Sequence, residues 1–501
     1  MVFPVIGGDG KPTGYEIDNS LRFSDTNYLT RDNTTQSGGG TNFTFSAWLK
    51  MTPYSVGGYQ GILSIFKDSN DYFEIYKDNS EKLQICQNIN GTSVCYQNQD
   101  FTYRDYSAWY HLVVSFNNSA SGEINKIKTY VNGQEISADE KVTNGNPFAD
   151  VGLGDSAYDT RVGAYRDNTD PTWNGYMADV HLIAGQTLAA SYFGETNDNG
   201  VWIPKKYTGT FGGNGFKLEF QQTGTSQNSS GMGADTSGED NHLAVTGLSS
   251  VDVTTDTPTN NFCTINPIDV GSGHTSLTIS EGNTKVVKSS TESNPGDGDR
   301  VGTTMKFTKG KWYWEEKAVS GAATGGNGIY SDKLGGPAHW HDNYGYYFDP
   351  NGNESNSGSQ IARRQENDEI GYGSSAMDDV SNNDIIMCAL DLDNNRWYIG
   401  VNGQWSNNNA ASGGTATANS AFNQSSLAGY FTIPSGGNGG FWGPFFGPAG
   451  STTAKETQFN FGNPPFSISS GNSDANGYGN FEYAVPSGYY SMCTKNLAEY
   501  G

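Results

Sequence analysis

The sequence predicts an all-β protein made of two tandem antiparallel β-sandwich (jelly-roll) domains. Short apolar or alternating runs recur along the chain, and turns rich in Gly, Asn, Ser and Thr separate them. The tetrapeptide Val-Asn-Gly-Gln occurs twice, at 131–134 and at 401–404. Asn-Gly is the strongest local signal for a two-residue turn between antiparallel strands, because both turn residues adopt positive φ. Each copy follows two strand-like runs, so we expect each to belong to the central hairpin of one sandwich.

Length, charge and hydropathy narrow the class of protein. A chain of 501 residues has room for two or three domains. The formal net charge of −24 disfavours binding to nucleic acid or to a bare anionic membrane, where Lys and Arg clusters carry the interaction. No run approaches the roughly 18 apolar residues of a membrane-spanning helix, and the start lacks the features of a signal peptide. We therefore expect no nucleic-acid partner, no membrane insertion, and synthesis in a cytoplasm without export.

The first sandwich is expected over residues 20–221, after an N-terminal arm at 1–19 that Gly and Pro interrupt. Period-two alternation is clear near its start, where Phe43, Phe45 and Leu49 fall on one side of a strand. In chain order, further strands are expected at 61–66, 72–76, 108–116, 126–131, 160–165 and 173–183. No long helical period interrupts these runs, which favours packed sheets over a helical layer.

A further hairpin is expected around Asn90-Gly91. A two-residue turn there pairs Cys86 with Cys95 at a non-hydrogen-bonded position, where Cα atoms are ~4.5 Å apart. That distance is within the range of a disulfide, so a bond is allowed. Reduced thiols remain the alternative, because a chain without an export signal stays in a reducing compartment. The other cysteines, at 263, 388 and 493, are expected to be small core residues.

The second sandwich is expected over residues 263–496, after a stretch at 222–262 whose Ser, Gly and Thr content is typical of a linker. Aromatic side chains alternate along its first clear strand, from Lys311 to Lys317. Further strands are expected at 344–348, 369–372, 384–393, 396–401, 440–446 and 457–462. Residues 497–501 would form a short C-terminal tail.

Several segments of the first domain resemble a concanavalin A-like jelly roll of the laminin-G type. The resemblance covers about residues 20–190. It rests on Phe45-Ser-Ala-Trp-Leu49, Trp109-Tyr-His-Leu-Val-Val-Ser-Phe116 and Gly175-Tyr-Met-Ala-Asp-Val-His-Leu-Ile183. Laminin-G-like domains often hold calcium, so the resemblance implies a Ca²⁺ site at Asp25 and Asp179, near the opening and closing strands. The alternative is that Asp179 accepts backbone hydrogen bonds.

The second domain resembles a SPRY domain over about residues 263–496. The matching segments are Gly310-Lys-Trp-Tyr-Trp-Glu315, Tyr344-Gly-Tyr346, Val401-Asn-Gly403 and Phe459-Asn-Phe-Gly462. SPRY domains are sandwiches whose loops bind protein or glycan partners, so the resemblance implies a binding module.

The order of the modules resembles that of structural or tail-fibre proteins of marine bacteriophages. Three further segments carry this resemblance: 200–209 (Gly-Val-Trp-Ile-Pro-Lys-Lys-Tyr-Thr-Gly), 261–267 (Asn-Phe-Cys-Thr-Ile-Asn-Pro) and 485–497. It implies a virion protein on the outside of the particle, attached to capsid or tail proteins as a homo-oligomer. The expected external partner is a host-surface glycan or protein, and the alternative is a purely structural decoration without a receptor.

A glycan-degrading enzyme is the third possibility, and the sequence argues against it. Glycoside hydrolysis needs a close pair of carboxylates. The nearest match to the laminarinase pattern Glu-x-Asp-x-x-Glu is Glu16-Ile-Asp18, which lacks the third carboxylate and precedes the first strand. We therefore expect no catalytic residues.

Aromatic residues in loops are the candidates for ligand binding. Trp340, His341, Tyr344 and Tyr346 follow Gly335-Gly-Pro337, and Trp405 lies just beyond the second Asn-Gly turn. Sugar rings stack on such side chains, and loops held by Gly and Pro often carry binding residues. The alternative is that these aromatic side chains lie in the core of the sandwich.

Overall fold

The computed structural model is nearly all β, which confirms the predicted fold class. The chain divides into two compact units with the boundary between Asn261 and Phe262. The structure describes residues 14–24, 26–34, 39–53, 58–97, 101–136, 139–141, 147–166, 172–270, 277–289, 300–321, 326–331, 345–349, 359–365, 368–377, 380–406, 422–433, 440–447 and 454–501. No helix within these ranges is both long and apolar enough to cross a membrane.

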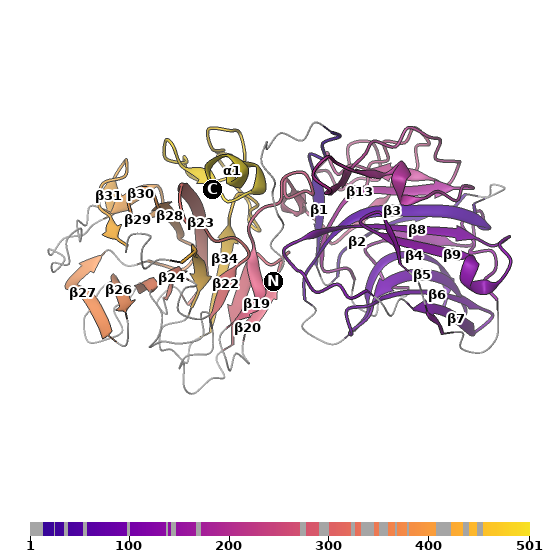
Figure 1. Ribbon diagram of the computed structural model, residues 1–501, viewed down its shortest axis with the longest axis horizontal. Helices are drawn as coiled ribbons and strands as arrows, with labels where there is room; N and C mark the ends of the chain where they lie inside the picture. Colours follow the sequence, from indigo (N-terminus) through magenta and orange to yellow (C-terminus); the bar gives the residue numbers. More distant parts are fainter. Residues whose placement is uncertain are drawn as a thin grey trace. The chain divides into compact units, whose positions relative to one another are not determined.

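The first unit contains two antiparallel sheets, drawn in indigo to magenta in Figure 1. The sheet that we call the β3 sheet contains, in spatial order, β10 (Gln134–Ile136), β9 (Ile127–Val131), β8 (Trp109–Asn117), β3 (Asn42–Met51), β13 (Gly175–Ala184), β1 (Ser20–Phe23) and β18 (Val253–Thr254), with β16 (Phe216–Leu218) paired to β13. The sheet that we call the β5 sheet contains β11 (Asp139–Lys141), β7 (Thr92–Gln97), β6 (Leu83–Ile89), β5 (Asp71–Lys77), β4 (Gln60–Asp68), β12 (Asp159–Val162), β2 (Tyr28–Asp32) and β17 (Ala244–Thr246).

The core of the first unit lies between these two sheets. Phe43 and Phe45 of β3 and Phe73 and Ile75 of β5 are fully buried in one apolar cluster. Successive side chains on a strand point to opposite faces, so the residues between them lie on the outer faces of the sheets. The period-two alternation read from the sequence therefore specifies which face of each strand is buried.

The outer face of the β3 sheet is covered by a later part of the same unit. Phe193 and Tyr207 pack against Val113 of β8 in a second apolar cluster. A short hairpin of β14 (Gly194–Thr196) and β15 (Trp202–Pro204) belongs to this cover. The outer face of the β5 sheet carries a different set of side chains, which form the candidate site.

The predicted Asn-Gly turns are confirmed at 90–91, 132–133 and 402–403. Asparagine has φ of 48° in all three, and glycine has φ of 79°, 78° and 83° respectively. Both central residues thus have the positive φ of a type I′ turn, which fits the right-handed twist of the flanking strands.

The segment 222–262, predicted to be a linker, is part of the first unit. Met232 and Leu243 are fully buried in its core. β17 pairs with β2, and β18 pairs with β1. Asp235 accepts a hydrogen bond from the backbone N–H of Lys217 at 2.8 Å. A Ser/Gly/Thr-rich composition allows turns, but it does not show whether apolar residues within the segment anchor it to a core.

Parts of the predicted arm and tail pack against buried residues of the first and the second unit, respectively. Ile17 of the arm is buried and packs in a cluster with Trp48. Residues 1–13 lie outside the described ranges. Most of the predicted tail at 497–501 belongs to helix α1 (Thr494–Tyr500), whose apolar side chains pack against the core of the second unit.

The second unit also contains two sheets. The sheet that we call the β24 sheet contains, in spatial order, β19 (Ile265–Val270), β22 (Val301–Thr303), β33 (Trp442–Phe446), β24 (Asn327–Ser331), β25 (Gly345–Asp349), β26 (Ser359–Gln365) and β27 (Asp368–Met377). The sheet that we call the β23 sheet contains β20 (Leu277–Ser280), β21 (Lys285–Lys288), β34 (Lys455–Asn460), β23 (Lys311–Ser320), β28 (Ile385–Asp391), β29 (Arg396–Val401), β30 (Gln404–Ser406) and β31 (Phe422–Gln424). Two short strands, β32 (Phe431–Thr432) and β35 (Tyr490–Ser491), pair with β29 and β23.

Large aromatic residues fill the core of the second unit. Trp312 and Trp314 of β23 lie in one apolar cluster with Ile329 of β24 and Trp442 of β33. The predicted core cysteines at 263, 388 and 493 are buried free thiols, as expected.

Two adjacent glutamates of β23 are buried on opposite sides of the strand. Glu316 accepts hydrogen bonds from Trp314 Nε1 and Asn327 Nδ2, each at 2.8 Å. Glu315 accepts the backbone N–H of Tyr483 at 2.8 Å. Burial disfavours the charged form and raises the pKa of both carboxyl groups above the usual value of glutamate.

Candidate ligand-binding face

Polar and aromatic side chains share the outer face of the β5 sheet in the first unit. Strand pairing aligns them in three rows: Phe66, Tyr72 and Asn88; Arg161, Ser64, Glu74, Cys86 and Cys95; and Gly61, Tyr76, Gln84 and Gln97. Their neighbours along each strand are in the core, so these residues point away from it. We call this set, together with Tyr59, Tyr165 and Arg166, the outer β5 face.

A glycine allows a second segment to lie directly on this face. A Cβ atom at Gly61 would lie 2.1 Å from backbone atoms of both Ala164 and Tyr165. Only glycine tolerates so close an approach of one backbone to another. The segment after β12 therefore crosses β4 at this point and brings Tyr165 and Arg166 to side chains that are far away in the sequence.

Three tyrosines form a stack at one end of the face. The Tyr59 and Tyr165 rings are stacked with centroids 5.5 Å apart, and Tyr76 lies edge-on to both, at 5.2 and 5.1 Å. Tyr59 is 41% exposed, whereas Tyr76 and Tyr165 are buried. Burial raises the pKa of both Tyr76 and Tyr165, so their phenols stay neutral. The stack presents the Tyr59 ring to solvent on a rigid base, as an aromatic platform would.

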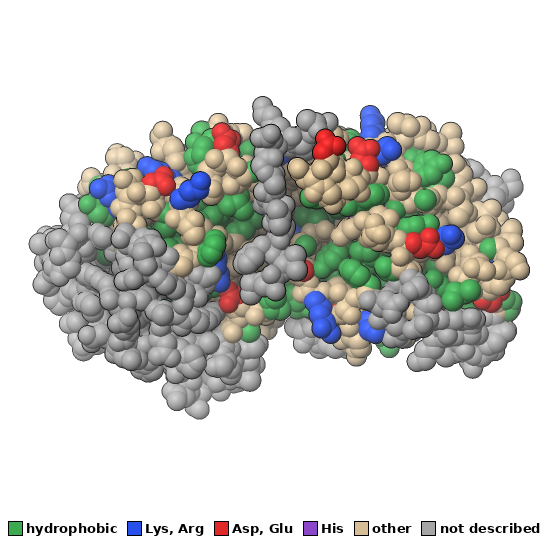
Figure 2. All heavy atoms as spheres, in the orientation of Figure 1, with side chains coloured by type: hydrophobic (Ala, Val, Ile, Leu, Met, Phe, Trp, Pro, Cys, Tyr) green, Lys and Arg blue, Asp and Glu red, His purple; other side chains and the backbone are tan. Residues whose placement is uncertain are grey.

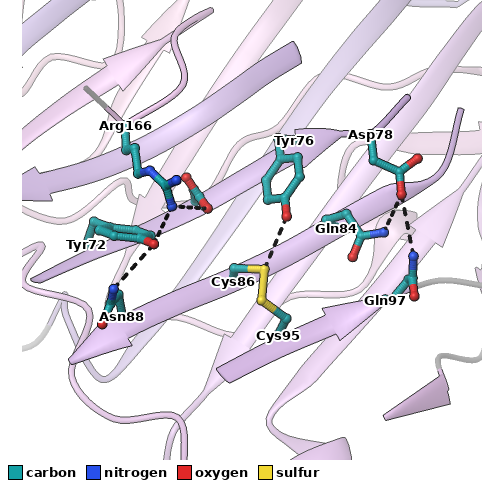
Figure 3. The surroundings of a disulfide bond; sticks show 10 residues. Tyr72, Tyr76, Asp78, Gln84, Cys86, Asn88, Cys95, Gln97 and Arg166 are labelled. Atoms are coloured by element: carbon teal, nitrogen blue, oxygen red, sulfur yellow. Dashed lines mark hydrogen bonds and ion pairs between the residues drawn. A yellow bond between two sulfur atoms is a disulfide. The ribbon is translucent and has the colours of Figure 1, made fainter. Parts of the chain in front are cut away.

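Arg166 lies beside this stack and is held by three side chains, one of which, Tyr72, is labelled with it in Figure 3. Its guanidinium lies 4.9 Å from the ring centroid of Tyr72 and 4.8 Å from that of Tyr165. Its Nη1 donates a hydrogen bond to the Tyr72 hydroxyl and is 3.7 Å from Glu74 Oε1. The Arg166 side chain is 30% exposed and that of Glu74 is 2% exposed. A ligand that reaches this point therefore meets the guanidinium first, with the carboxylate behind it.

A second arginine on the face, Arg161, is paired with a neighbouring carboxylate, that of Asp159. Arg161 donates from Nε and Nη2 to the two carboxylate oxygens of Asp159, at 2.9 and 2.8 Å. Its guanidinium lies 4.4 Å from the ring centroid of Phe66, and Nη1 donates to the backbone oxygen of Arg166. The bidentate geometry and these extra contacts fix the orientation of Arg161.

Two buried polar atoms on the face lack a hydrogen-bond partner within the described part of the chain. They are the Ser64 hydroxyl oxygen and Asn88 Oδ1. Ser64 is fully buried, and the Nδ2 atom of Asn88 donates to the Tyr72 hydroxyl at 3.4 Å. A buried polar atom without a partner is costly, and such atoms are common where a ligand or water supplies the missing bond.

The cysteines predicted to face each other are bonded in the structure. Cys86 pairs with Cys95 in the register expected for a turn at 90–91, with Cα atoms 4.1 Å apart. The disulfide lies on the outer face, and Figure 3 shows the Tyr76 hydroxyl pointing at Cys86 Sγ, 3.5 Å away. It joins β6 to β7 directly beside the tyrosine stack.

The aromatic residues predicted to bind ligand in the second unit are not brought together in the described structure. Trp340, His341 and Tyr344 lie outside the described residues. Tyr346 occupies β25, where it pairs with Ile329. Trp405 is only 5% exposed and packs against Tyr313 in a small apolar cluster. The prediction for Trp405 is therefore corrected: it belongs to a core, as the alternative held, and offers no open ring.

The calcium site implied at Asp25 and Asp179 does not fit the described residues. Asp25 lies outside them. Asp179 is buried, accepts a hydrogen bond from Tyr15 at 3.1 Å, and lies 3.6 Å from Lys217 Nζ. A lysine ammonium beside the carboxylate opposes a cation that requires six to eight oxygen ligands. No group of three or more His, Cys, Asp or Glu side chains suited to a metal occurs in the described ranges.

The outer β5 face was not predicted, although part of its signal is in the sequence. Tyr72, Glu74 and Tyr76 alternate with the core residues Phe73 and Ile75, which marks a strand with a polar, aromatic outer face. The other half comes from the segment after β12, about ninety residues later in the chain. No residue near either segment in the sequence indicates that the two segments are in contact.

A comparison with models of protein families finds a match within the first unit. Residues 23–191, about a third of the chain, match the model described as the concanavalin A-like lectin/glucanases superfamily. No curated protein is detectably similar to the sequence.

Several solved structures resemble parts of the chain. The native heptameric SAP-like pentraxin from Limulus polyphemus is 15% identical over 34% of this chain and 78% of its own, with a TM-score of 0.25. The full-length tailspike protein 2 of Escherichia coli O157:H7 bacteriophage CAB120 is 15% identical over 35% of this chain, with a TM-score of 0.26. The match spans 23% of that tailspike. The TRIM65 PSpry domain is 12% identical over 40% of this chain and 92% of its own, with a TM-score of 0.23.

Proposed function

We propose that this chain is a bacteriophage virion surface protein that binds a host-surface glycan through the outer β5 face of its first unit. The observation that carries the proposal is the tyrosine stack, which exposes the Tyr59 ring beside the held guanidinium of Arg166. An aromatic platform next to fixed polar groups is the arrangement that sugar rings require. The match of residues 23–191 to a lectin and glucanase family model supports a carbohydrate ligand.

The virion part of the proposal rests on the sequence. The order of the two sandwiches and the segments at 200–209, 261–267 and 485–497 resemble bacteriophage structural and tail-fibre proteins. On that basis the protein sits on the exterior of the particle as a homo-oligomer and is attached to capsid or tail proteins. Whether the protein is attached to the capsid or to the tail, its first unit binds the host-surface glycan.

The chemistry of the face favours recognition over catalysis. A glycosidase needs two carboxyl groups flanking the scissile bond, one of them protonated to act as the acid. The carboxylates of Glu74 and Asp159 each lie against an arginine, Arg166 and Arg161 respectively. Two carboxylates that are each engaged by an arginine do not form the acid and nucleophile pair that the reaction needs. We therefore propose that the protein is not an enzyme.

Binding of purified, labelled protein to susceptible and resistant host cells tests the proposal. We expect binding to susceptible cells only. Tyr59→Ala should weaken it about 10- to 30-fold, the loss typical of an exposed aromatic anchor. Tyr192→Ala is the matched control, because Tyr192 is 52% exposed and lies outside the outer β5 face. Absence of binding to either cell type would contradict the proposal and favour a purely structural role.

A further inference from the structure

We propose that the outer β5 face selects uncharged pyranose rings over acidic sugars such as uronic or sialic acids. This inference rests on the proposed function and adds the chemical class of the ligand. It follows from how the two arginines of the face are bound, from the charge around them, and from the aromatic platform beside them.

Neither arginine is placed to neutralise an incoming anion alone. Arg161 is held in a bidentate pair with Asp159, and its side chain is 11% exposed. Arg166 is the accessible one, but Glu74 Oε1 lies 3.7 Å from its Nη1. An acidic sugar that bound Arg166 would bring its carboxylate close to that of Glu74. Glu74 is almost fully buried, so water does little to screen the repulsion between the two carboxylates.

The charge of the whole chain also disfavours acidic ligands. The chain carries 53 acidic and 29 basic side chains, a net charge of −24. On the described part of the surface in Figure 2, Lys and Arg side chains lie singly or next to Asp and Glu, and they form no extended basic patch. A negatively charged protein repels polyanions over distances of about a Debye length, ~8 to 10 Å at physiological salt. Recognition of an acidic polysaccharide would have to overcome this repulsion.

The hydrogen-bonding groups of the face match hydroxyls better than carboxylates. Asn88 Oδ1 accepts hydrogen bonds but cannot donate, and it lacks a partner among the described residues. The Glu74 carboxylate also only accepts, whereas the Arg166 guanidinium only donates. A sugar hydroxyl can accept a hydrogen bond from the guanidinium without adding negative charge beside the buried Glu74 carboxylate. A carboxylate group can also accept from the guanidinium, but it places a second negative charge next to Glu74.

The aromatic platform supplies an apolar surface for the ring of a neutral sugar. The exposed ring of Tyr59 rests on Tyr165, whose other neighbours are Tyr76 and Arg166. The C–H face of a pyranose is apolar and covers such a ring without placing charge on it. A neutral sugar therefore stacks on Tyr59 on the side of the face where the Arg166 guanidinium is accessible to its hydroxyls.

Competition experiments on the full-length protein test the inference. Labelled protein bound to susceptible cells is displaced with methyl glucoside, methyl mannoside and methyl galactoside, or with glucuronic acid and N-acetylneuraminic acid. We expect at least one neutral glycoside to displace it at a concentration at least tenfold lower than either acid. We also expect binding to change less than about threefold between 50 and 300 mM salt, because a neutral ligand gains little from charge attraction.

A charge variant separates the role of Glu74 from that of net charge. Glu74→Gln removes the buried negative charge behind Arg166, and we expect it to improve displacement by the acidic sugars at least tenfold relative to the neutral glycosides. Asp198→Asn makes the same charge change at an exposed turn near the β3 sheet, and the ratio should not change. Thermal unfolding checks that both variants fold, and the wild-type competition stands without them.

The outcomes are distinguishable. Displacement by acidic sugars at lower concentrations than by every neutral glycoside would overturn the inference while leaving glycan binding by the face intact. An unchanged acid-to-neutral ratio in Glu74→Gln would overturn the role assigned to that carboxylate. Failure of the wild-type protein to bind cells at all would overturn the proposed function itself.

Discussion

The Cys86–Cys95 bond fixes the strand edge on which the outer β5 face depends. It links β6 to β7 across the face, and Tyr76, the edge-on member of the tyrosine stack, touches Cys86. Asp78 adds a second tie in the same region, because Gln84 and Gln97 both donate to its Oδ2 atom, at 2.7 and 3.4 Å. Figure 3 shows the two ties side by side.

Reduction of this disulfide should destabilise the first unit. The bond closes a short loop, with nine residues of sequence separation, and the chain-entropy relation gives a stabilisation of about 2 to 3 kcal/mol for a loop of that size. We expect the double variant Cys86→Ser/Cys95→Ser to lose that amount in chemical unfolding. A reductant should have no effect on the double variant, because the remaining cysteines are free thiols. Equal stability of the oxidised wild type and the variant would contradict the assignment.

Single residues also show where sequence reasoning succeeds and where it stops. The facing of Cys86 and Cys95 followed from a local rule, since a two-residue turn sets the register of its strands. The local sequence around Trp405 predicts a strand but does not reveal that Tyr313 of a distant strand packs against it. The pair formed by Arg166 and Tyr72 could not be predicted, since it joins segments with 94 residues of sequence separation.

At the scale of elements, the Asn-Gly hairpins depend on backbone conformation more than on side-chain contacts. Gly91 has φ of +79°, and a Cβ atom there would meet nothing closer than Asn70 Oδ1 at 3.4 Å. The cost of a substitution is therefore almost purely conformational. This turn sets the register that places Cys86 opposite Cys95.

Gly91→Ala should lower the free energy of unfolding of the first unit by about 1 to 2 kcal/mol, the cost of the left-handed region for an L-residue. Gly91→Asn is the matched control and should lose less, because asparagine tolerates that region. Urea unfolding followed by tyrosine and tryptophan fluorescence measures the difference. Equal losses in the two variants would show that a contact, and not φ, sets the cost.

The elements themselves were largely predictable, but their assembly was less so. Alternation and Asn-Gly turns are local signals, and they identified the central strands and hairpins of both units. The 222–262 segment was misread because its anchors, Met232 and Leu243, are single apolar residues in a polar context. The average composition of the segment does not reveal single apolar residues, although the fold depends on their burial.

At the scale of the whole molecule, the two units carry buried ionisable groups of opposite kinds. In the first unit, burial lowers the pKa of His111 from 6.5 to about 3. The Nδ1 atom of His111 accepts a hydrogen bond from Trp202 Nε1 at 3.0 Å, which only a neutral ring can do. His181 is also fully buried with a lowered pKa. In the second unit, burial raises the pKa of Glu315 and Glu316.

The stabilities of the two units should therefore respond to pH in opposite directions. Unfolded histidines bind protons below about pH 6.5, whereas burial makes His111 and His181 harder to protonate in the folded protein. Acidification from pH 7.5 to 5.5 should then lower the stability of the first unit by about 1 kcal/mol through His111, and His181 acts in the same direction. Folded Glu315 and Glu316 bind protons more readily than unfolded glutamate, so the second unit should gain stability over the same change.

Differential scanning calorimetry of the full chain at several pH values measures both responses. Glu316→Gln should flatten the pH dependence of the second unit and leave that of the first unchanged. Movement of both transitions in the same direction with the same slope would contradict the assignment of these groups.

A glycan array measures whether the outer β5 face binds uncharged glycans. The array is probed with wild-type, Tyr59→Ala and Tyr192→Ala proteins at matched concentrations. We expect the wild type and Tyr192→Ala to bind the same neutral oligosaccharides, and Tyr59→Ala to lose most of that signal. Wild-type signal confined to acidic glycans, an equal signal from Tyr59→Ala, or no signal on any glycan would contradict it.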